Sequence, residues 1–519
     1  MGDACERRFR ERPFLRGFRA HRFLPRLGGV GVPGEESVTQ TARGKRVRRL
    51  AAACSVLVAG WALATAVVAS SRHELHPPSR SAPDSGGNAF GFGFTPQDLH
   101  ALLQAGHSDG LLPNGNRVAL SLNEELQAQV FDLFRRFDPL YGVFAAMEPD
   151  TGRVVALVGY RRGGEADPWL PLKAIYPAAS LVKVVTASAA IERGKVSPEE
   201  EISYRGGIYG ITRGGIRARN GRGIPKMSLE EAIARSANAV FGNVTVNHVG
   251  GPVLEEYLAK FGFGQEIPFD LPVEPSRGQV PRDEYELART GAGFGEVYVS
   301  PLHMAMIMSA IASGGAMPRP VLIDRIEDRD GQPLYESSPA KWRDTVLPET
   351  ANAVVRMMVK TVEMGTSHRT FGTPARTPLL QDMDVAGKTG SLSGWTPRVH
   401  FEWFAGVAPV GSPRLALSAL VVNDHRWKIK GSYVGKEALN SYFGYPSSLP
   451  PMYSKARGTR KWRATPHAVR KGEPAVKAKT KKGGKAAGVR KRRAPGKAVR
   501  KKEPVKPVAV TSRSARTGG

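Results

Sequence analysis

Cysteine is almost absent from this chain of 519 residues, and both cysteines, Cys5 and Cys54, lie near its beginning. The rest of the sequence therefore cannot form a disulfide framework or a cysteine-based metal site. The eleven histidines are scattered, and none forms a His-x-x-x-His pair. The sequence thus predicts no metal site and no cofactor.

Acidic residues are scarce toward the C-terminal end, and the two ends of the chain together carry all of the net charge of +28. Residues 1–49 sum to +8 and residues 455–519 to +21, which leaves −1 for residues 50–454. A high charge does not make the main body a polyanion-binding protein, because that body is close to neutral. Residues 451–519 contain few large apolar side chains, so we expect a disordered tail rich in Lys, Arg, Ala and Pro.

Long apolar runs are also absent, except for the 20 uncharged residues from Leu50 to Ala69. A helix of that length spans about 30 Å, the thickness of the hydrocarbon core of a bilayer. Five Lys and Arg residues lie between positions 43 and 49, which predicts a cytoplasmic N-terminus. We expect a basic cytoplasmic tail over 1–49 and one transmembrane anchor over 50–70. A signal peptide cleaved near Ala69-Ser70 is the alternative.

The residues after the apolar run divide into a linker and one large domain. Residues 71–117 are predicted to be a linker with a short helix at Pro96–Gln104, too short for a second catalytic domain. Residues 118–450 have the periodicity of an α/β (α+β) domain, with an antiparallel five-stranded sheet flanked by helices. The predicted strands are Tyr141–Met147, Arg153–Gly159, Asp384–Leu392, Glu402–Pro409 and Leu415–Asn423. The predicted helices are Leu122–Phe137, Pro177–Arg193, Leu229–His248 (alternatively a strand), Leu254–Phe261, Pro301–Ser313 and Thr350–Met364.

The first candidate site motif is Ser180-Leu-Val-Lys183. Pro177 suits the first turn of a helix, on which residues 180 and 183 would share a face. A serine hydroxyl becomes a nucleophile when a neighbouring base takes its proton. A lysine can be that base if desolvation or a nearby positive charge lowers its pKa. The motif is weak alone, because Ser338-Pro-Ala-Lys341 also matches it.

Two further motifs follow in a fixed order. Ser236-Ala-Asn238 is also weak alone, since Ser121-Leu-Asn123 has the same pattern. Lys388-Thr-Gly390 occurs once, at the end of a predicted strand and before Ser391. Only one combination gives the order Ser-x-x-Lys, Ser-x-Asn, Lys-Thr-Gly with the first on a helix and the third on a strand. The ordered set is therefore far more specific than any member.

This ordered set resembles that of the penicillin-binding protein transpeptidases and the related serine β-lactamases. Three other segments are similar to the family, and the likeness covers about residues 118–445. They are Met147–Gly152, the glycine-rich Arg289–Pro301, and Glu402–Pro409. The resemblance implies the penicillin-binding/β-lactamase-like fold.

The resemblance also implies roles for the site residues. Ser180 would be acylated with Lys183 as the general base, and Ser236 and Lys388 would relay the proton to the leaving amine. Asn238 would hold the amide of the donor peptide. Thr389, Gly390 and Ser391 would bind the peptide, with the two hydroxyls on its terminal carboxylate. The backbone N–H groups of Ser180 and Ser391 would form the oxyanion hole.

The function expected from these roles is a D,D-transpeptidase outside the plasma membrane, with peptidoglycan stem peptides and β-lactam antibiotics as ligands. A D,D-carboxypeptidase or a β-lactamase-like hydrolase would share the chemistry. The Glu-x-x-Leu-Asn motif of one β-lactamase class is absent between residues 238 and 388. Nucleic-acid binding by the basic tail is a further alternative, but the predicted topology places that tail outside. We expect the tail to contact anionic envelope polymers and no nucleic acid.

Overall fold

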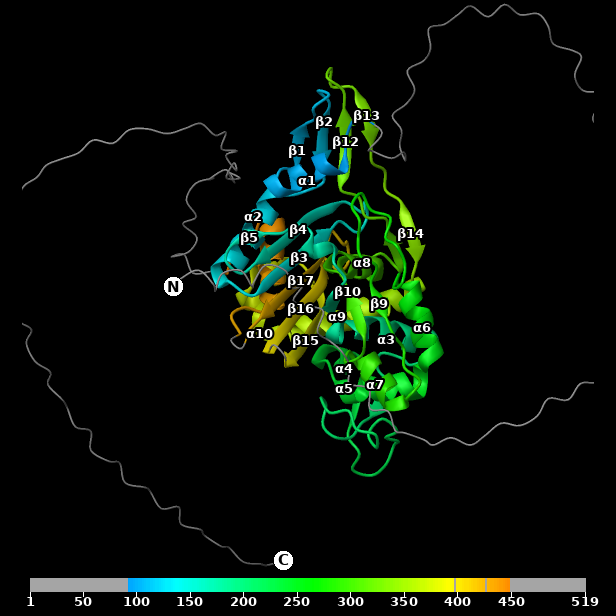
Figure 1. The fold of residues 1–519 in the computed structure, drawn as a ribbon. Helices are drawn as coiled ribbons and strands as arrows, with labels where there is room; N and C mark the ends of the chain where they lie inside the picture. Colours follow the sequence, from blue (N-terminus) through cyan, green and yellow to red (C-terminus); the bar gives the residue numbers. More distant parts are fainter. Residues whose placement is uncertain (1–91, 396–397, 425–426, 449–519) are drawn as a thin grey trace, which may run out of the picture. The chain divides into compact units, whose positions relative to one another are not determined.

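The computed structural model describes residues 92–395, 398–424 and 427–448, and its centre is one antiparallel sheet (Figure 1). The order of its strands is β15-β16-β17-β3-β4-β5. Their bounds are β3 (Tyr141–Met147), β4 (Val154–Arg161), β5 (Glu165–Ala166), β15 (Ala386–Trp395), β16 (Arg398–Ala408) and β17 (Leu415–Asn423). The prediction of a five-stranded sheet was wrong by one strand, because β5 adds a sixth at the edge. With two residues, β5 is too short to give an alternating pattern.

Each face of this sheet carries its own apolar core. Successive side chains of a strand point to opposite faces, so Trp403 belongs to one core and Phe404 to the other. On the first face, α8 (Pro301–Ala312) packs against β3, β16 and β17. On the second, α2 (Glu124–Phe137) packs against β4, and α12 (Gly431–Phe443) against β16 and β17. The predicted α+β class with helices packed on an antiparallel sheet is therefore confirmed.

The middle of the chain forms a helical region beside β15. Its helices are α3 (Val182–Glu192), α4 (Leu229–Arg235), α5 (Asn238–Val244), α6 (Gly251–Lys260), α7 (Glu284–Ala292) and α9 (Pro348–Glu363). Two details differ from the sequence prediction. Pro177 lies in the short strand β6 (Tyr176–Pro177) and not in a first helical turn, and the 3₁₀ turn η3 (Ala179–Leu181) separates it from α3. The predicted helix 229–248 is broken at Ser236 and ends in the π-helical turn η4 (Thr245–Val249).

Residues 92–117 are folded against the rest of the described chain. They contain α1 (Pro96–Ala105), close to the predicted helix, and also β1 (Asp109–Leu111). This strand opens a second sheet of order β1-β2-β12-β13, with β2 (Arg117–Leu120), β12 (Ile323–Glu327) and β13 (Pro333–Glu336). Phe94 and Leu99 are buried in the first core. The sequence suggested a linker here because β2, besides pairing with β1, pairs with β12, which lies two hundred residues further along the chain.

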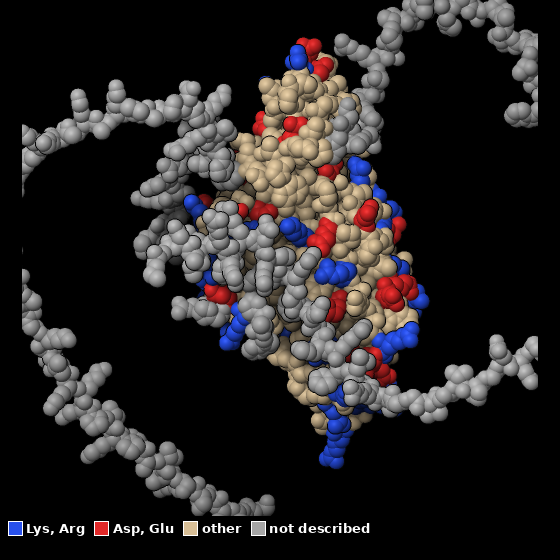
Figure 2. All heavy atoms as spheres, in the orientation of Figure 1, with Lys and Arg blue, Asp and Glu red and all other residues tan. Residues whose placement is uncertain are grey.

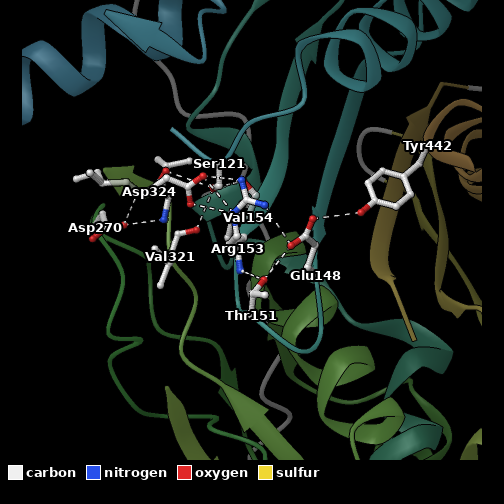
Figure 3. Close-up of polar contacts among 11 residues, drawn as sticks. Ser121, Glu148, Thr151, Arg153, Val154, Asp270, Val321, Asp324 and Tyr442 are labelled. Carbon is white, nitrogen blue, oxygen red and sulfur yellow. Dashed lines mark hydrogen bonds and ion pairs between the residues drawn. The ribbon is translucent and has the colours of Figure 1, made fainter. Parts of the chain in front are cut away.

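A polar junction joins the hairpin of β3 and β4 to this second sheet and to α12 (Figure 3). The guanidinium of Arg153 binds Asp324 of β12 through two nitrogens, at 2.9 and 2.5 Å from the carboxylate oxygens, and it also reaches Glu148. The hydroxyl of Tyr442 donates to Glu148 at 3.2 Å. These contacts fix the hairpin between two elements that lie far apart in sequence.

The remaining elements are short. They are β7 (Glu201–Ser203), β8 (Lys226–Ser228), β9 (Arg277–Gly278), β10 (Val297–Val299), β11 (Ala316–Pro318), β14 (Lys341–Asp344), α10 (His368–Phe371), α11 (Pro378–Asp382), η2 (Leu170–Leu172) and η5 (Pro374–Arg376). Among the described residues, no helix has the length and apolar character needed to cross a membrane. The predicted cytoplasmic tail, the anchor at 50–70 and the C-terminal tail from 451 lie outside the described residues.

Candidate active site

Ser180 lies in the turn η3, which is held from two sides. The indole N–H of Trp403, on β16, donates to the carbonyl of Pro177 at 2.9 Å. On the other side Gly293 has a φ of +99° and comes so close that a Cβ there would be 2.3 Å from the carbonyl oxygen of Ala179. Only glycine permits this approach at this φ. The turn therefore presents the serine hydroxyl from a fixed backbone.

Lys183 follows one turn later and is fully buried. Its Nζ donates to Ser180 Oγ at 2.8 Å, to Asn238 Oδ1 at 2.8 Å and to the carbonyl of Ala292 at 2.6 Å. Burial lowers the pKa of Lys183 well below its usual value, and the positive charge of Lys388 lowers it further. A lysine with such a pKa can be neutral, and so can accept the proton of the Ser180 hydroxyl.

Ser236 and Lys388 form a second serine–lysine pair. Lys388 is fully buried on β15, and its Nζ donates to Ser236 Oγ at 2.9 Å and to the carbonyl of Thr389 at 2.8 Å. Burial lowers the pKa of Lys388 to about 7. The site thus holds two buried lysines whose pKa values are both lowered, and Lys388 can exchange a proton near neutral pH.

Because the chain breaks between α4 and α5, Ser236 and Asn238 accept hydrogen bonds from different lysines. Ser236 adopts the left-handed conformation, with φ 56° and ψ 42°, and ends α4. Asn238 begins α5, and its Oδ1 accepts from Lys183 while its Nδ2 donates to the carbonyl of Tyr209 at 3.1 Å. A continuous helix over 229–248 would not allow both contacts, so the error in the predicted helix falls at the site itself.

The strand β15 is the edge of the main sheet, and its residues 389–391 follow Lys388 directly. The hydroxyls of Thr389 and Thr366 are 2.5 Å apart. Ser391 is exposed and its hydroxyl donates to Glu402 Oε2 at 3.2 Å. Gly390 is buried, and a Cβ there would lie 3.3 Å from Leu181, which belongs to the turn η3 that carries Ser180. The structure therefore brings all eight predicted site residues to one place.

Two residues of the site were not found by the sequence analysis as site residues. Thr366 follows α9, and no motif marks it. Glu402 has a visible signal, because it is the one acidic residue in the strand β16. It is 5% exposed, and its Oε1 has no hydrogen-bond partner among the described residues. Burial raises the pKa of Glu402 to about 7, against the opposing charge of Lys430 and the hydrogen bond from Ser391.

The second copies of the weak motifs lie in structural positions. Lys341 begins β14 and pairs with Asp344 at 2.8 Å, so its partner is not Ser338. Ser121 donates to the carbonyl of Val154 at 2.7 Å in the polar junction of Figure 3, and Asn123 caps α2. Neither copy combines a serine with a buried lysine.

The arrangement can support transfer of an acyl group. A serine hydroxyl hydrogen-bonded to a buried lysine of lowered pKa can act as a nucleophile, and a second serine–lysine pair can carry a proton. The hydroxyls of Thr389 and Ser391 lie on the open edge strand next to the buried ammonium group of Lys388, where an anionic group can be bound.

Comparisons with known proteins agree with this geometry. Residues 142–443 match the family model described as the penicillin binding protein transpeptidase domain. The chain is 26% identical over 348 residues to the peptidoglycan D,D-transpeptidase PbpA of Mycobacterium tuberculosis, covering 60% of this chain and 68% of that protein. It is also 26% identical over 340 residues to the penicillin-binding protein PbpB of Mycolicibacterium smegmatis, covering 59% of this chain and 50% of that protein.

A solved structure shows the same fold. The imipenem acyl-enzyme complex of penicillin-binding protein A from M. tuberculosis superimposes with a TM-score of 0.54 and 23% identity. The match covers 68% of this chain and 85% of that one. At this identity the likeness supports the architecture, and the chemistry depends on the residues of the site.

Proposed function

Because the chain belongs to the penicillin-binding protein transpeptidase family, we propose that it is a membrane-anchored serine D,D-transpeptidase that cross-links peptidoglycan stem peptides. The observation that carries the proposal is the hydrogen bond between Ser180 Oγ and the buried Lys183 Nζ, within reach of a second lysine that lowers the pKa of the first. The names of its relatives and the resemblance of its ordered motifs support the same activity.

In the first half-reaction a donor stem peptide acylates the enzyme. Neutral Lys183 takes the proton of Ser180 while Oγ attacks the carbonyl carbon of the scissile peptide bond, and a C–O bond forms. The C–N bond to the terminal residue then breaks, and that residue leaves as an amine after receiving a proton through Ser236 and Lys388. The acyl group remains as an ester on Ser180.

Binding groups surround this bond. We assign the terminal carboxylate of the donor to Thr389 and Ser391, and the donor amide to Asn238. The backbone N–H groups of Ser180 and Ser391 would hold the developing oxyanion. Gly390, where a Cβ would crowd Leu181 at 3.3 Å, lies between the two hydroxyl-bearing residues.

In the second half-reaction the amine of an acceptor peptide attacks the ester, a new amide forms and Ser180 regains its proton. Water in place of the amine would make the enzyme a carboxypeptidase. Incubation with a donor peptide and an amine acceptor distinguishes the two activities. A transpeptidase gives the amide product, whereas a carboxypeptidase gives only the free acid even though the acceptor is present.

The experiment that tests the proposal is acylation by a fluorescent penicillin, with the adduct measured by intact mass. We expect one long-lived adduct, mapped to Ser180. Ser180→Ala should abolish it, whereas the matched Ser338→Ala should leave it unchanged. Lys183→Ala should slow acylation by about 10²–10⁴-fold, because a general base is lost. Labelling that survives in Ser180→Ala would refute the assignment.

The anchor proposal depends on the apolar run Leu50–Ala69 and its basic leader. Fusions at residue 90 should be active with a reporter that requires export and inactive with one that requires the cytoplasm. The opposite pattern would exclude the orientation and with it a peptidoglycan substrate. A mature form beginning near residue 70 would show a cleaved signal in place of an anchor.

A further inference from the structure

The segment between β7 and α4 differs in charge from the rest of the domain. We call residues 204–226 the Arg-rich loop. It contains six Lys and Arg residues, seven glycines and no acidic residue. The net charge of residues 50–454 is −1, and the loop contributes +6 to it. The other residues of 50–454 therefore have a net charge of −7. A strongly positive loop therefore projects from a body that is otherwise slightly negative.

The backbone of the loop is attached to the helices of the active site. The carbonyl of Tyr209 accepts from Asn238 Nδ2 at 3.1 Å, and that of Ile208 accepts from the N–H of Ala239 at 3.1 Å. Further contacts run from Asn243 to Ala218 (3.0 Å), from Asn247 to Ile216 (2.8 Å) and from Tyr285 to Ile211 (3.3 Å). The loop thus has a fixed base directly on Asn238, whose Oδ1 binds Lys183.

Half of the charged side chains of the loop have acidic partners. Arg213 binds Asp283 at 3.3 Å, and Arg217 binds Glu284. Lys226 is 3.7 Å from Glu201. The other three, Arg205, Arg219 and Arg222, are exposed and have no acidic partner within the described part of the chain.

The space-filling view shows basic residues at the end of the described surface where the loop lies. The loop extends below α4 and α5 in Figure 1, and the lowest part of the described surface in Figure 2 is blue. A Cβ added at Gly207, Gly214 or Gly223 would meet no atom within 4 Å, so the loop is open around these positions. Tyr209 is 61% exposed on the same loop.

We propose that the Arg-rich loop binds the carboxylate groups of stem peptides on un-cross-linked peptidoglycan strands, beside the Ser236-Ala-Asn238 side of the active site. This inference rests on the proposed function and extends it to the substrate class: strands with free stem-peptide carboxylates bind better than strands in which they are amidated. The planar guanidinium suits carboxylates because it donates two parallel hydrogen bonds.

The strength of such binding depends on how many ion pairs form at the same time. A single exposed ion pair contributes little, and salt screens it. A strand carries many stem peptides, so several carboxylates can engage the three unpaired arginines together. The position of the loop favours stem peptides as ligands, because the base of the loop contacts α5, the helix that begins with Asn238. A stem peptide bound there stays close to Ser180.

The test compares two triple variants for binding to labelled, soluble, un-cross-linked strands. Arg205→Gln, Arg219→Gln and Arg222→Gln together remove the unpaired charges. The control, Arg117→Gln, Lys195→Gln and Arg376→Gln, removes the same charge from exposed positions outside the loop. At low salt the loop variant should bind native strands about 3- to 30-fold more weakly than the wild type, given the usual size of exposed ion pairs. The control should bind within twofold of the wild type.

A second arm uses the same strands after carbodiimide amidation of their carboxylates. These should bind the wild type and the loop variant equally and weakly, and equal thermal unfolding midpoints should show that the loop variant is folded. The inference is overturned if the loop variant binds native strands as the wild type does, or if amidation leaves wild-type binding unchanged. Loss of the Ser180–penicillin adduct in the wild type would instead refute the proposed function.

Discussion

The positive charge of Lys388 lowers the pKa of Lys183, although the two lysines belong to β15 and α3 and lie far apart in sequence. Burial is the larger cause of the low pKa of Lys183, and the neighbouring lysine adds to it. Each lysine also donates to its own serine, Ser180 or Ser236. Acylation should therefore depend on Lys388 through the protonation state of Lys183 as well as through proton relay.

We expect Lys388→Met to change the pH profile of penicillin acylation. Without the charge of Lys388, the pKa of Lys183 rises, so a higher pH is needed to make Lys183 neutral. The acid limb of the profile should move to higher pH, and the rate at pH 7 should fall by about 10²-fold or more, since a proton-transfer group is also lost. Stopped-flow acylation between pH 5 and 10 measures both effects.

The control is Lys388→Arg, which keeps the positive charge. Its acid limb should stay where the wild type has it, even if its rate is reduced. An unshifted acid limb in a folded Lys388→Met variant would show that Lys388 does not set the pKa of Lys183.

How much of the site could be foreseen is clear from these same residues. The order of the three motifs identified all eight predicted residues, because spacing and residue type are properties of the sequence. The contacts among these residues could not be read from the sequence. The break at Ser236 contradicts a helical pattern that runs on to residue 248, and only the contacts of Ser236 with Lys388 and of Asn238 with Lys183 explain it.

The strands of the fold show the same limit of prediction from sequence. The five long strands were predicted because their apolar residues form clear runs. The short strands β5 and β1 were missed, since two or three residues carry no period and their partners fix them. Glu402 was visible as an acidic residue in an apolar strand, but its contact with Ser391 depends on the register between β15 and β16.

Glu402 should make the stability of the domain depend on pH. Burial raises its pKa from the usual 4.5 to about 7, so the folded state favours the protonated acid. The stability associated with that acid is fully present below pH 4.5 and is lost as the pH rises through about 7. Glu402→Gln should therefore be more stable than the wild type at pH 8, by about 3 kcal/mol at most, and similar to it at pH 4.

Urea unfolding of the described domain at the two pH values measures this difference, and the same variant tests a link to ligand binding. Ionised Glu402 lies behind Ser391, which we assign to the carboxylate of the substrate. Glu402→Gln should therefore acylate with penicillin faster than the wild type at pH 8, and the gap should close at pH 5. If the variant and the wild type have equal stability at both pH values, Glu402 is not protonated in the folded state near neutral pH.

Gly293 should be intolerant of a side chain because it lies close to the turn η3, which carries Ser180. In Gly293→Ala the new Cβ would meet the carbonyl of Ala179 at 2.3 Å and the N–H of Ser180 at 2.8 Å, at a φ that alanine disfavours. The turn must move, so we expect acylation to slow at least tenfold and the free energy of unfolding to fall by about 1–3 kcal/mol. The control is Gly411→Ala, where nothing lies within 4 Å. Wild-type acylation in a folded Gly293→Ala variant would show that this contact does not position Ser180.

The C-terminal tail is the last element with a testable role. Residues 455–519 carry 23 Lys and Arg residues, opposed only by Glu473 and Glu503, which gives a net charge of +21. On the proposed topology the tail meets the anionic polymers of the envelope, and many weak contacts would hold the enzyme against them. Truncation after Ser454 should therefore weaken co-sedimentation of the ectodomain with purified envelope at low salt. The difference should vanish as salt rises, because exposed charges are screened over about 8 Å at physiological ionic strength.

A variant with Gln at every Lys and Arg of the tail separates charge from length, since it keeps the chain as long as in the wild type. It should co-sediment as weakly as the truncated protein. Both should form the penicillin adduct on Ser180 at the wild-type rate, because the tail follows the last helix of the domain, α12, and its Pro-rich end. If the wild type, the truncated protein and the Gln variant co-sediment equally at every salt concentration, the tail does not tether the enzyme and its charge is merely solvated.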